Sequence, residues 1–114
     1  MTLARRALGT EGEKAVAAWY EARGYEVLGR NWRCREGELD LILRQGRRLV
    51  FCEVKSRSTT AFGLPAEAVN HAKQARIRRL AALWLEDAPA RPGEIRFDVA
   101  CVLAGTIEVI EAAF

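Results

Sequence analysis

Acidic and basic side chains interrupt two apolar stretches in the middle of the chain, and their spacing suggests metal chemistry. The first stretch, residues 37–43, reads GELDLIL, and the second, residues 49–55, reads LVFCEVK. Asp40 lies in the first stretch, and Glu53 and Lys55 lie in the second. A buried carboxylate is costly unless it is paired or bound to a metal. These three side chains are therefore the first candidates for a functional site.

Two carboxylates and a lysine fit a divalent-cation site for phosphate chemistry. Asp40 and Glu53 offer hard oxygen ligands, and water and a substrate phosphate complete the octahedron that Mg²⁺ prefers. A bound Mg²⁺ or Mn²⁺ lowers the pKa of a bound water and shields the charge that develops on phosphorus. Lys55 would lie beside that water or the phosphate oxygens. The alternative is an exposed sheet face on which Glu53 pairs only with Lys55 or Arg48.

A β-hairpin would bring the two stretches together, because the turn-like residues 44–47 (RQGR) separate them. Side chains alternate between the faces of a strand. On the first strand we expect one face to carry Glu38, Asp40 and Ile42, and the other to carry Leu39, Leu41 and Leu43. On the second strand we expect one face to carry Leu49, Phe51, Glu53 and Lys55, and the other to carry Val50, Cys52 and Val54.

Helices and further strands are expected on both sides of the hairpin. Thr10-x-x-Glu13 has the form of a capping box and predicts a helix that begins at Thr10 and stops at Gly24. A second helix is predicted from Pro65 to Ala88-Pro89. Short strands are expected at residues 25–28, 95–103 and 106–110. The predicted order is α, β, β, β, α, β, β.

Two side chains on these helices could join the acids. Glu13 is either the reciprocal member of the capping box or an acid that leans toward the core, because it shares a helical stripe with Tyr20. Lys73 lies in the middle of an apolar face with Val69 and Ile77. There it either contacts a phosphate or extends past the core to water.

Other charged residues have simpler interpretations. We expect Asp98 to form a structural pair with Arg96 on one strand face, whereas Glu38 is either an acid behind the metal ligands or a bystander. Arg76, Arg78 and Arg79 are spread around the second helix, so we expect most of them to be solvated. One or two of them could contact a nucleic-acid backbone.

Length and composition restrict the fold. The chain has 114 residues, half of them hydrophobic, and a formal net charge of +3. We therefore expect one domain over residues 1–114, and the mild basic charge permits nucleic-acid binding. No apolar run approaches the roughly 18–20 residues of a spanning helix, so we expect no membrane contact and a cytoplasmic location.

The cysteines and the single histidine do not form a metal-binding pattern. Cys34, Cys52 and Cys101 are odd in number and widely separated, and His71 is the one histidine. A disulfide framework or a structural zinc site is therefore not expected. We expect Cys52 and Cys101 to be small buried apolar residues and His71 to be an ordinary surface residue.

The motifs resemble those of a known nuclease superfamily. Residues 37–42 (GELDLI) and 51–57 (FCEVKSR) resemble the D…ExK core of the PD-(D/E)XK, or restriction-endonuclease-like, superfamily. More closely, the chain resembles the YraN-type family of uncharacterised bacterial proteins, which is similar to archaeal Holliday-junction resolvases. That likeness runs through Gly12-Glu13, Phe62-Gly63-x-Pro65, Lys73, Arg96-Phe97-Asp98 and Ala113-Phe114. The usual proline of the motif is absent, since Leu39 precedes Asp40.

The resemblance implies a fold, a reaction and residue roles. The fold is α/β, a three-layer restriction-endonuclease-like fold whose mixed central sheet is flanked by helices, with an αβββαβ core and a terminal strand. Asp40 and Glu53 would be metal ligands, Lys55 the catalytic lysine and Glu13 an additional acid. The implied activity is Mg²⁺-dependent hydrolysis of DNA phosphodiester bonds, with branched DNA as a candidate substrate and a homodimer as the assembly. DNA-contacting residues would be Lys73, Arg57 and Arg76.

Two other classes of function stay open. The first is a nucleic-acid-binding module that keeps the fold and has little catalysis of its own. The second is a protein-interaction domain with surface acids, which would bind no metal. Its weak nucleic-acid binding would depend little on salt, whereas phosphate contacts give a log-affinity slope of roughly −0.9 per neutralised phosphate.

Overall fold

The computed structural model describes residues 3–57, 69–88 and 91–114. Its elements are α1 (Leu3–Glu21), β1 (Glu26–Cys34), β2 (Gly37–Gln45), β3 (Arg48–Arg57), α2 (His71–Glu86), β4 (Glu94–Leu103) and β5 (Thr106–Ile110). The predicted order of helices and strands is therefore confirmed.

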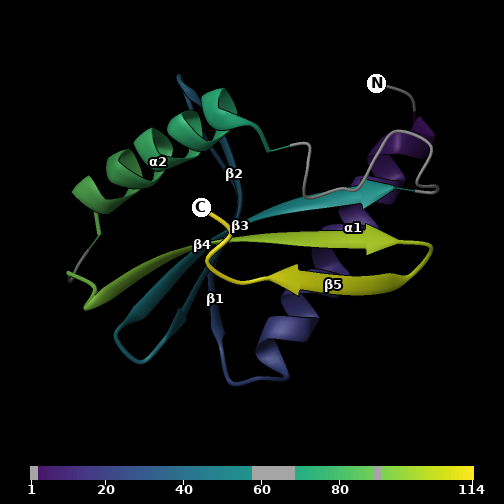
Figure 1. Cartoon of the computed structure of the whole chain (residues 1–114), viewed down its shortest axis with the longest axis horizontal. Coiled ribbons are helices and arrows are strands. Elements are labelled where there is room, and N and C mark those ends of the chain that lie inside the picture. Colours follow the sequence, from purple (N-terminus) through teal and green to yellow (C-terminus); the bar gives the residue numbers. More distant parts are fainter. Residues whose placement is uncertain (1–2, 58–68, 89–90) are drawn as a thin grey trace.

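The five strands form one sheet in the order β1-β2-β3-β4-β5 (Figure 1). The β3–β4 pair is parallel, and the other three pairs are antiparallel. A parallel pair needs a crossover connection, and α2 lies in the connection between β3 and β4. The sheet is therefore mixed, as the resemblance to the nuclease superfamily implied.

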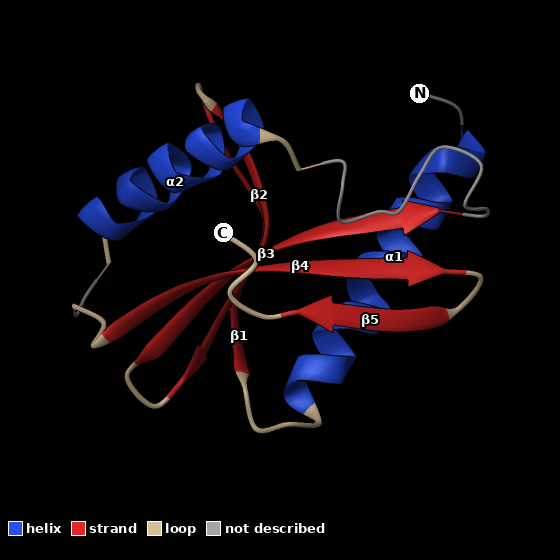
Figure 2. Ribbon diagram, viewed as in Figure 1, coloured by secondary structure: helices blue, strands red, loops and turns tan. Residues whose placement is uncertain are grey.

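The two helices cover opposite faces of the sheet (Figure 2). The α1-side core joins Val16, Ala17 and Tyr20 of α1 to strand residues that include Leu41, Val50 and Ala100. The α2-side core joins Ile77, Leu80 and Ala81 of α2 to strand residues that include Ile42, Phe51 and Val99. This arrangement of three layers confirms the α/β fold with a mixed sheet flanked by helices.

Both helices begin at positions that differ from the predicted ones. α1 begins at Leu3, not Thr10, because residues 3–8 (LARRAL) are strong helix formers that extend the helix toward the N-terminus. α2 begins at His71, where the Asn70 side chain accepts a hydrogen bond from the Lys73 backbone N–H at 2.9 Å. The predicted start at Pro65 lies outside the described residues, whereas α2 ends at Glu86, two residues before the predicted end at Ala88-Pro89.

The turns have the glycines that the sequence suggested. Gly24 follows α1 with φ +89°, and Gly46 turns the β2–β3 hairpin with φ +60°. β1, in contrast, is longer than the predicted strand at residues 25–28. It extends to Cys34 because it pairs with β2 along its length.

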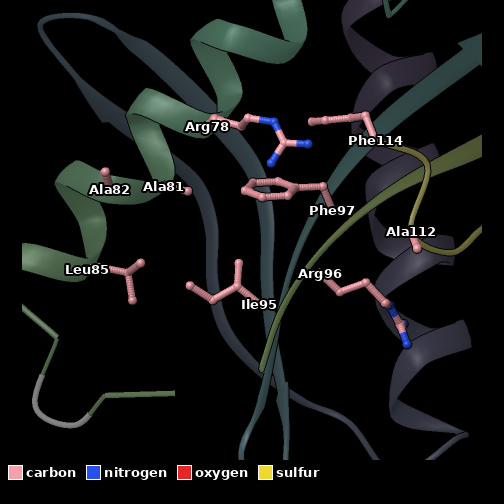
Figure 3. Close-up of a pocket in the computed structure, with 9 residues that line it drawn as sticks. All are labelled: Arg78, Ala81, Ala82, Leu85, Ile95, Arg96, Phe97, Ala112 and Phe114. Atoms are coloured by element: carbon pink, nitrogen blue, oxygen red, sulfur yellow. The ribbon is translucent and has the colours of Figure 1, made fainter. Parts of the chain in front are cut away.

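The residues after β5 return over the α2 side of the sheet. Phe114 stacks on Phe97 at a ring-centroid distance of 5.3 Å, and the Ala113 N–H donates to the Phe97 carbonyl at 2.7 Å. The Arg78 guanidinium lies over both rings, at 4.8 Å from the Phe97 centroid (Figure 3). This segment therefore closes one end of the α2-side core.

Candidate functional site

The alternation of side chains between the two faces of the sheet is interrupted in β1 at Asn31 and in β2 at Asp40, at the same level of the sheet. Leu41, which is opposite Arg30, packs in the α1-side core, whereas Leu39, which is opposite Trp32, packs in the α2-side core. Regular alternation would place residues two apart on one face. Asn31 has φ +50°, in the left-handed region, and interrupts the alternation between these two pairs.

This face change corrects the predicted pattern of β2. Leu39 and Ile42 were expected on different faces of the sheet, but both residues pack in the α2-side core. The regular β2–β3 ladder ends at the pair of Leu41 and Cys52. Beyond that pair, Asp40 Oδ2 accepts a hydrogen bond from the Val54 backbone N–H at 2.8 Å. The kink thus directs the Asp40 carboxylate across to β3.

Glu53 lies on the α2 side of β3, as alternation predicted. Its face also carries Leu49 and Phe51, both in the α2-side core, and its side chain is 9% exposed. Glu53 Oε1 contacts Lys73 Nζ at 2.9 Å and Lys55 Nζ at 3.4 Å. The alternative of an exposed surface pair is therefore wrong: Glu53 is a buried carboxylate held by two ammonium groups.

Asp40 is electrostatically coupled to the other acids. Burial and then the Glu53 charge raise the pKa of its carboxyl to about 7, against the Val54 hydrogen bond that favours the ionised form. Glu13 and Glu38 also raise it. We call Glu13, Glu38, Asp40 and Glu53 the acid cluster. Carboxylates whose pKa is perturbed by burial and by neighbouring charges are common at functional sites.

Glu13 reaches the acid cluster from α1. Because α1 begins seven residues before Thr10, Glu13 lies inside the helix, and its interpretation as a capping-box residue is wrong. Burial raises the pKa of Glu13, whereas a hydrogen bond from the Asn31 side chain lowers it. Asn31 therefore affects the site in two ways. Its positive φ interrupts the strand beside Asp40, and its side-chain amide forms a hydrogen bond with Glu13.

The two lysines of the site differ in proton affinity. Burial lowers the pKa of Lys55, and its hydrogen bond with Lys73 lowers it further. Burial also opposes the charge on Lys73, but its hydrogen bonds with Lys55 and Glu53 outweigh that effect and raise its pKa. Lys55 is therefore the lysine of the pair that releases its proton first.

The remaining predicted residues lie around this centre. Arg57 is half-buried at the end of β3, and Arg76 is exposed on α2 near Gly37. Glu38 forms an ion pair with Arg33 at 3.3 Å and adds to the field on Asp40. The structure thus places Glu13, Asp40, Glu53, Lys55 and Lys73 in one interacting group.

Asp98 belongs to a separate structural network on the α1 side of the sheet. Its carboxylate accepts two hydrogen bonds from the Arg96 guanidinium, at 2.8 and 2.9 Å, which confirms the predicted Arg–Asp pair. It also accepts from the Tyr20 hydroxyl at 2.6 Å and from the Ala112 backbone N–H at 3.0 Å. All these donors satisfy a carboxylate that is completely buried.

Cys52, Cys101 and the histidine have the expected positions. Cys52 and Cys101 are buried, and Cys34 is partly exposed. His71 is exposed at the start of α2. Within the described residues, no group of three or more His, Cys, Asp or Glu side chains is arranged to hold a metal ion. Any cation at the acid cluster would therefore depend on water or substrate for most of its ligands.

Asn31 is the site residue that the sequence motifs did not identify. The sequence carried one signal of its role, because Asn is among the few residue types that tolerate a positive φ. That signal is common in turns, and residues 26–34 otherwise suggested no turn within a strand.

None of the helices in the described part of the chain is both long and apolar enough to cross a membrane. The fold and the site together define an α/β protein with a buried acid-and-lysine cluster beside a kink in its sheet. Comparison with known proteins then gives the family.

Residues 12–102 match the family described as "Uncharacterised protein family UPF0102", and the chain belongs to it. A UPF0102 protein of Beutenbergia cavernae is 55% identical, with 88% of this chain and 85% of the relative aligned. One of Frankia alni is 59% identical over 87% of this chain and 82% of its own length. One of Acidothermus cellulolyticus is 42% identical over 97% of this chain and 96% of its own length. The predicted YraN-type family is therefore confirmed.

Proposed function

We propose that this protein is a Mg²⁺-dependent endonuclease of the PD-(D/E)XK superfamily that hydrolyses phosphodiester bonds in DNA. One observation supports the proposal most directly. The Asp40 carboxylate, at the end of the regular β2–β3 ladder, is destabilised by Glu53, while two lysines lie against Glu53. The order of elements and the flanked mixed sheet also agree with the superfamily's architecture.

The donor set of the acid cluster suits Mg²⁺ or Mn²⁺. Asp40 and Glu53 provide carboxylate oxygens, the ligands that these cations prefer. One oxygen of each is engaged with the protein, Asp40 Oδ2 with Val54 and Glu53 Oε1 with the lysines. When bound, the cation would supply an acidified water and positive charge at the phosphate. It would also lower the pKa of Asp40, which burial raises in the metal-free protein.

The lysines and Glu13 have distinct proposed roles. Lys55 Nζ orients the attacking water or a phosphate oxygen, and its lowered pKa lets it give up a proton more readily than an exposed lysine. Lys73 Nζ, which keeps its charge, balances Glu53 and contacts the substrate phosphate. Glu13, which Asn31 holds, is the additional acid beside Asp40.

DNA contacts beyond the acids are assigned to Arg57 and Arg76 together with Lys73. Arg57 lies at the end of β3 and Arg76 on α2, so they lie on the strand and the helix that carry Glu53 and Lys73. Branched DNA is the proposed substrate. A homodimer would relate two sites by a two-fold axis, which symmetric cutting of two strands requires.

A second candidate function is a DNA-binding module without turnover. The observation that favours it is the 2.9 Å contact between Lys73 Nζ and Glu53 Oε1, because that ammonium already neutralises one proposed metal ligand. In this function the basic residues bind the phosphate backbone, and the acids only limit where it lies.

Cleavage of labelled branched and linear DNA with Mg²⁺ or Mn²⁺ tests the proposal. We expect the wild type to cut, and we expect Asp40→Ala and Lys55→Ala each to lose about 10²–10³ in rate, because each removes a group that stabilises the transition state. Lys14→Ala is the matched control, since Lys14 is an exposed lysine on α1 whose ion pair is with Glu11.

Three outcomes distinguish the candidates. Loss of cutting in the two site variants but not in Lys14→Ala supports the nuclease. Equal DNA binding without cutting in every protein supports the module. Absence of both binding and cutting rejects both functions. Light scattering on the same samples measures whether the active species is a dimer.

A further inference from the structure

A cavity lies at the opposite end of the β2–β3 hairpin from the acid cluster. It has a volume of about 440 Å³ and is bounded by the hairpin turn, the end of α2 and the residues before β4. At a rise of about 3.3 Å per residue, the five steps along β3 from Arg48 to Glu53 place the cavity about 17 Å from Glu53. Its volume is in the range of small-molecule sites.

The cavity carries an excess of positive charge. Four arginines line it, namely Arg44, Arg47, Arg48 and Arg91. Two have acidic partners outside the lining: Arg44 pairs with Glu26 at 2.7 Å, and Arg48 pairs with Glu94 at 3.0 Å. The described lining residues include no Asp or Glu. Arg47 and Arg91 therefore give the cavity a net charge that an anion would balance.

The position of Arg47 is fixed by its neighbours. Its carbonyl accepts hydrogen bonds from the backbone N–H groups of Gly93 and Glu94, at 2.8 and 3.2 Å. A Cβ on Gly93 would lie 3.1 Å from both Cβ and Nε of Arg47. The glycine thus permits the Arg47 side chain to lie across the backbone before β4, at the cavity rim.

The other walls of the cavity are apolar and include an aromatic ring. Trp84 packs edge-to-face against Phe51, with ring centroids 5.9 Å apart and an interplanar angle of 81°. This contact with the core fixes the indole while Trp84 still lines the cavity. Leu28 and Leu49 contribute aliphatic surface. Bases stack well on aromatic side chains, and phosphates bind arginines.

We propose that this cavity binds a nucleoside phosphate, with the base against Trp84 and the phosphate on Arg47 and Arg91. Two ligands present a nucleoside phosphate of this kind: a free mononucleotide, and one nucleotide of a single-stranded DNA. The inference does not rest on the proposed nuclease activity, because none of the acid-cluster residues lines the cavity.

NMR titration of the full chain with AMP in EDTA tests this inference. The protein has three tryptophans, so its ¹⁵N spectrum has three indole N–H signals, and Trp84→Phe, which keeps an aromatic ring against Phe51, identifies the Trp84 signal. We expect AMP to shift that signal saturably. We expect Arg47→Glu to weaken AMP binding by about tenfold or more, because it replaces a positive charge that contacts the phosphate with a negative one.

Arg79→Glu is the matched control, because Arg79 is exposed on α2 and does not line the cavity. The inference is overturned if millimolar AMP leaves the Trp84 signal unchanged, or if both arginine variants weaken binding equally. It is also overturned if inorganic phosphate alone gives the same shift, since the base would then not be recognised.

A short oligothymidine distinguishes the two sources. Tighter binding of the oligonucleotide than of AMP identifies a DNA strand as the ligand, and the reverse identifies the free nucleotide. Because EDTA prevents cleavage, a negative result here leaves the nuclease proposal intact, and a failed cleavage assay leaves this one intact.

Discussion

Asp40 is the least favourably placed charge in the acid cluster. Its carboxylate is largely removed from water and lies in the field of Glu53, Glu13 and Glu38, and one backbone N–H compensates only in part. A stable fold does not require a carboxylate at residue 40, because an amide there could accept the Val54 hydrogen bond without carrying a charge. The cost is consistent with a functional role for the carboxylate.

Replacing Asp40 with Asn should therefore stabilise the metal-free protein at high pH. The folded-state pKa of about 7 lies above the ordinary value of about 4, so the native protein holds a proton that the unfolded chain releases in that window. Wild-type stability falls as the pH rises from about 4 to 7. We expect Asp40→Asn to gain on the order of 4 kcal/mol at pH 8 and little at pH 4, because each pKa unit corresponds to about 1.4 kcal/mol.

Urea unfolding in EDTA at both pH values measures this difference. Glu108→Gln, which changes an exposed acid on β5, is the control and should show no such dependence. An Asp40→Asn effect of the same size at pH 4 and pH 8 would contradict a raised pKa.

At the residue scale, the sequence predicted which face of β3 carries Glu53 and Lys55, because alternation along a strand determines it. Glu53, Lys55 and Lys73 contact one another as a buried face requires. Asn31 could not be predicted, because a single positive φ in a strand leaves no periodic pattern. The same kink moved Leu39 to the α2 side, where simple alternation had not placed it.

At the element scale, the approach of α1 to β3 determines where Glu13 lies. Gly12 is buried, and a Cβ at this position would collide with the Ser56 side chain, lying 3.3 Å from its Cβ. Ser56 Oγ is itself buried and has no hydrogen-bond partner among the described residues. The absence of a side chain at residue 12 thus permits the helix to bring its next residue, Glu13, to the acid cluster.

Gly12→Ala should destabilise the protein even though alanine favours helices. The helix-propensity gain of about 1 kcal/mol is opposed by overpacking against Ser56, which typically costs 1–3 kcal/mol. We expect a net loss of about 1 kcal/mol in the free energy of unfolding, measured in urea. The double variant Gly12→Ala/Ser56→Gly should recover that loss, and failure to do so would show that the contact does not limit the helix position.

The elements themselves were largely predictable, but their ends were not. Hydrophobic periodicity gave the β2–β3 hairpin and the α2 helix, whereas Thr10 suggested a helix start that good helix formers before it override. β1 was predicted too short because its outer half is stabilised by pairing with β2, a contact that local composition does not reveal.

At the scale of the whole molecule, Asp98 connects three parts of the chain. Its carboxylate accepts hydrogen bonds from Tyr20 of α1, from Arg96 of β4 and from Ala112 after β5. Arg96 also reaches Glu111 at 2.8 Å and the Tyr25 hydroxyl at 3.2 Å. The sequence predicted the pair within β4 but not Tyr20, which lies 78 residues away.

Asp98→Asn should be more damaging than removal of any single donor. It leaves the Arg96 guanidinium, which is 11% exposed, without its main charge partner, and such losses typically cost about 3–5 kcal/mol. Tyr20→Phe should cost about 1 kcal/mol, since only one hydrogen bond is lost. Thermal or urea unfolding compares the two variants. A smaller loss for Asp98→Asn than for Tyr20→Phe would show that the ion pair adds no net stability.

The β2–β3 hairpin also determines the order in which the acid cluster can assemble during folding. Hairpins close in about 1–10 μs, before contacts between distant segments form. Asp40, Glu53 and Lys55 share this hairpin, whereas Glu13 and Lys73 come from helices on either side of it in the chain. With Glu38, the hairpin therefore brings together three acids of the cluster while Lys55 is the only site lysine that it carries, and Lys73 arrives only when α2 packs on the sheet.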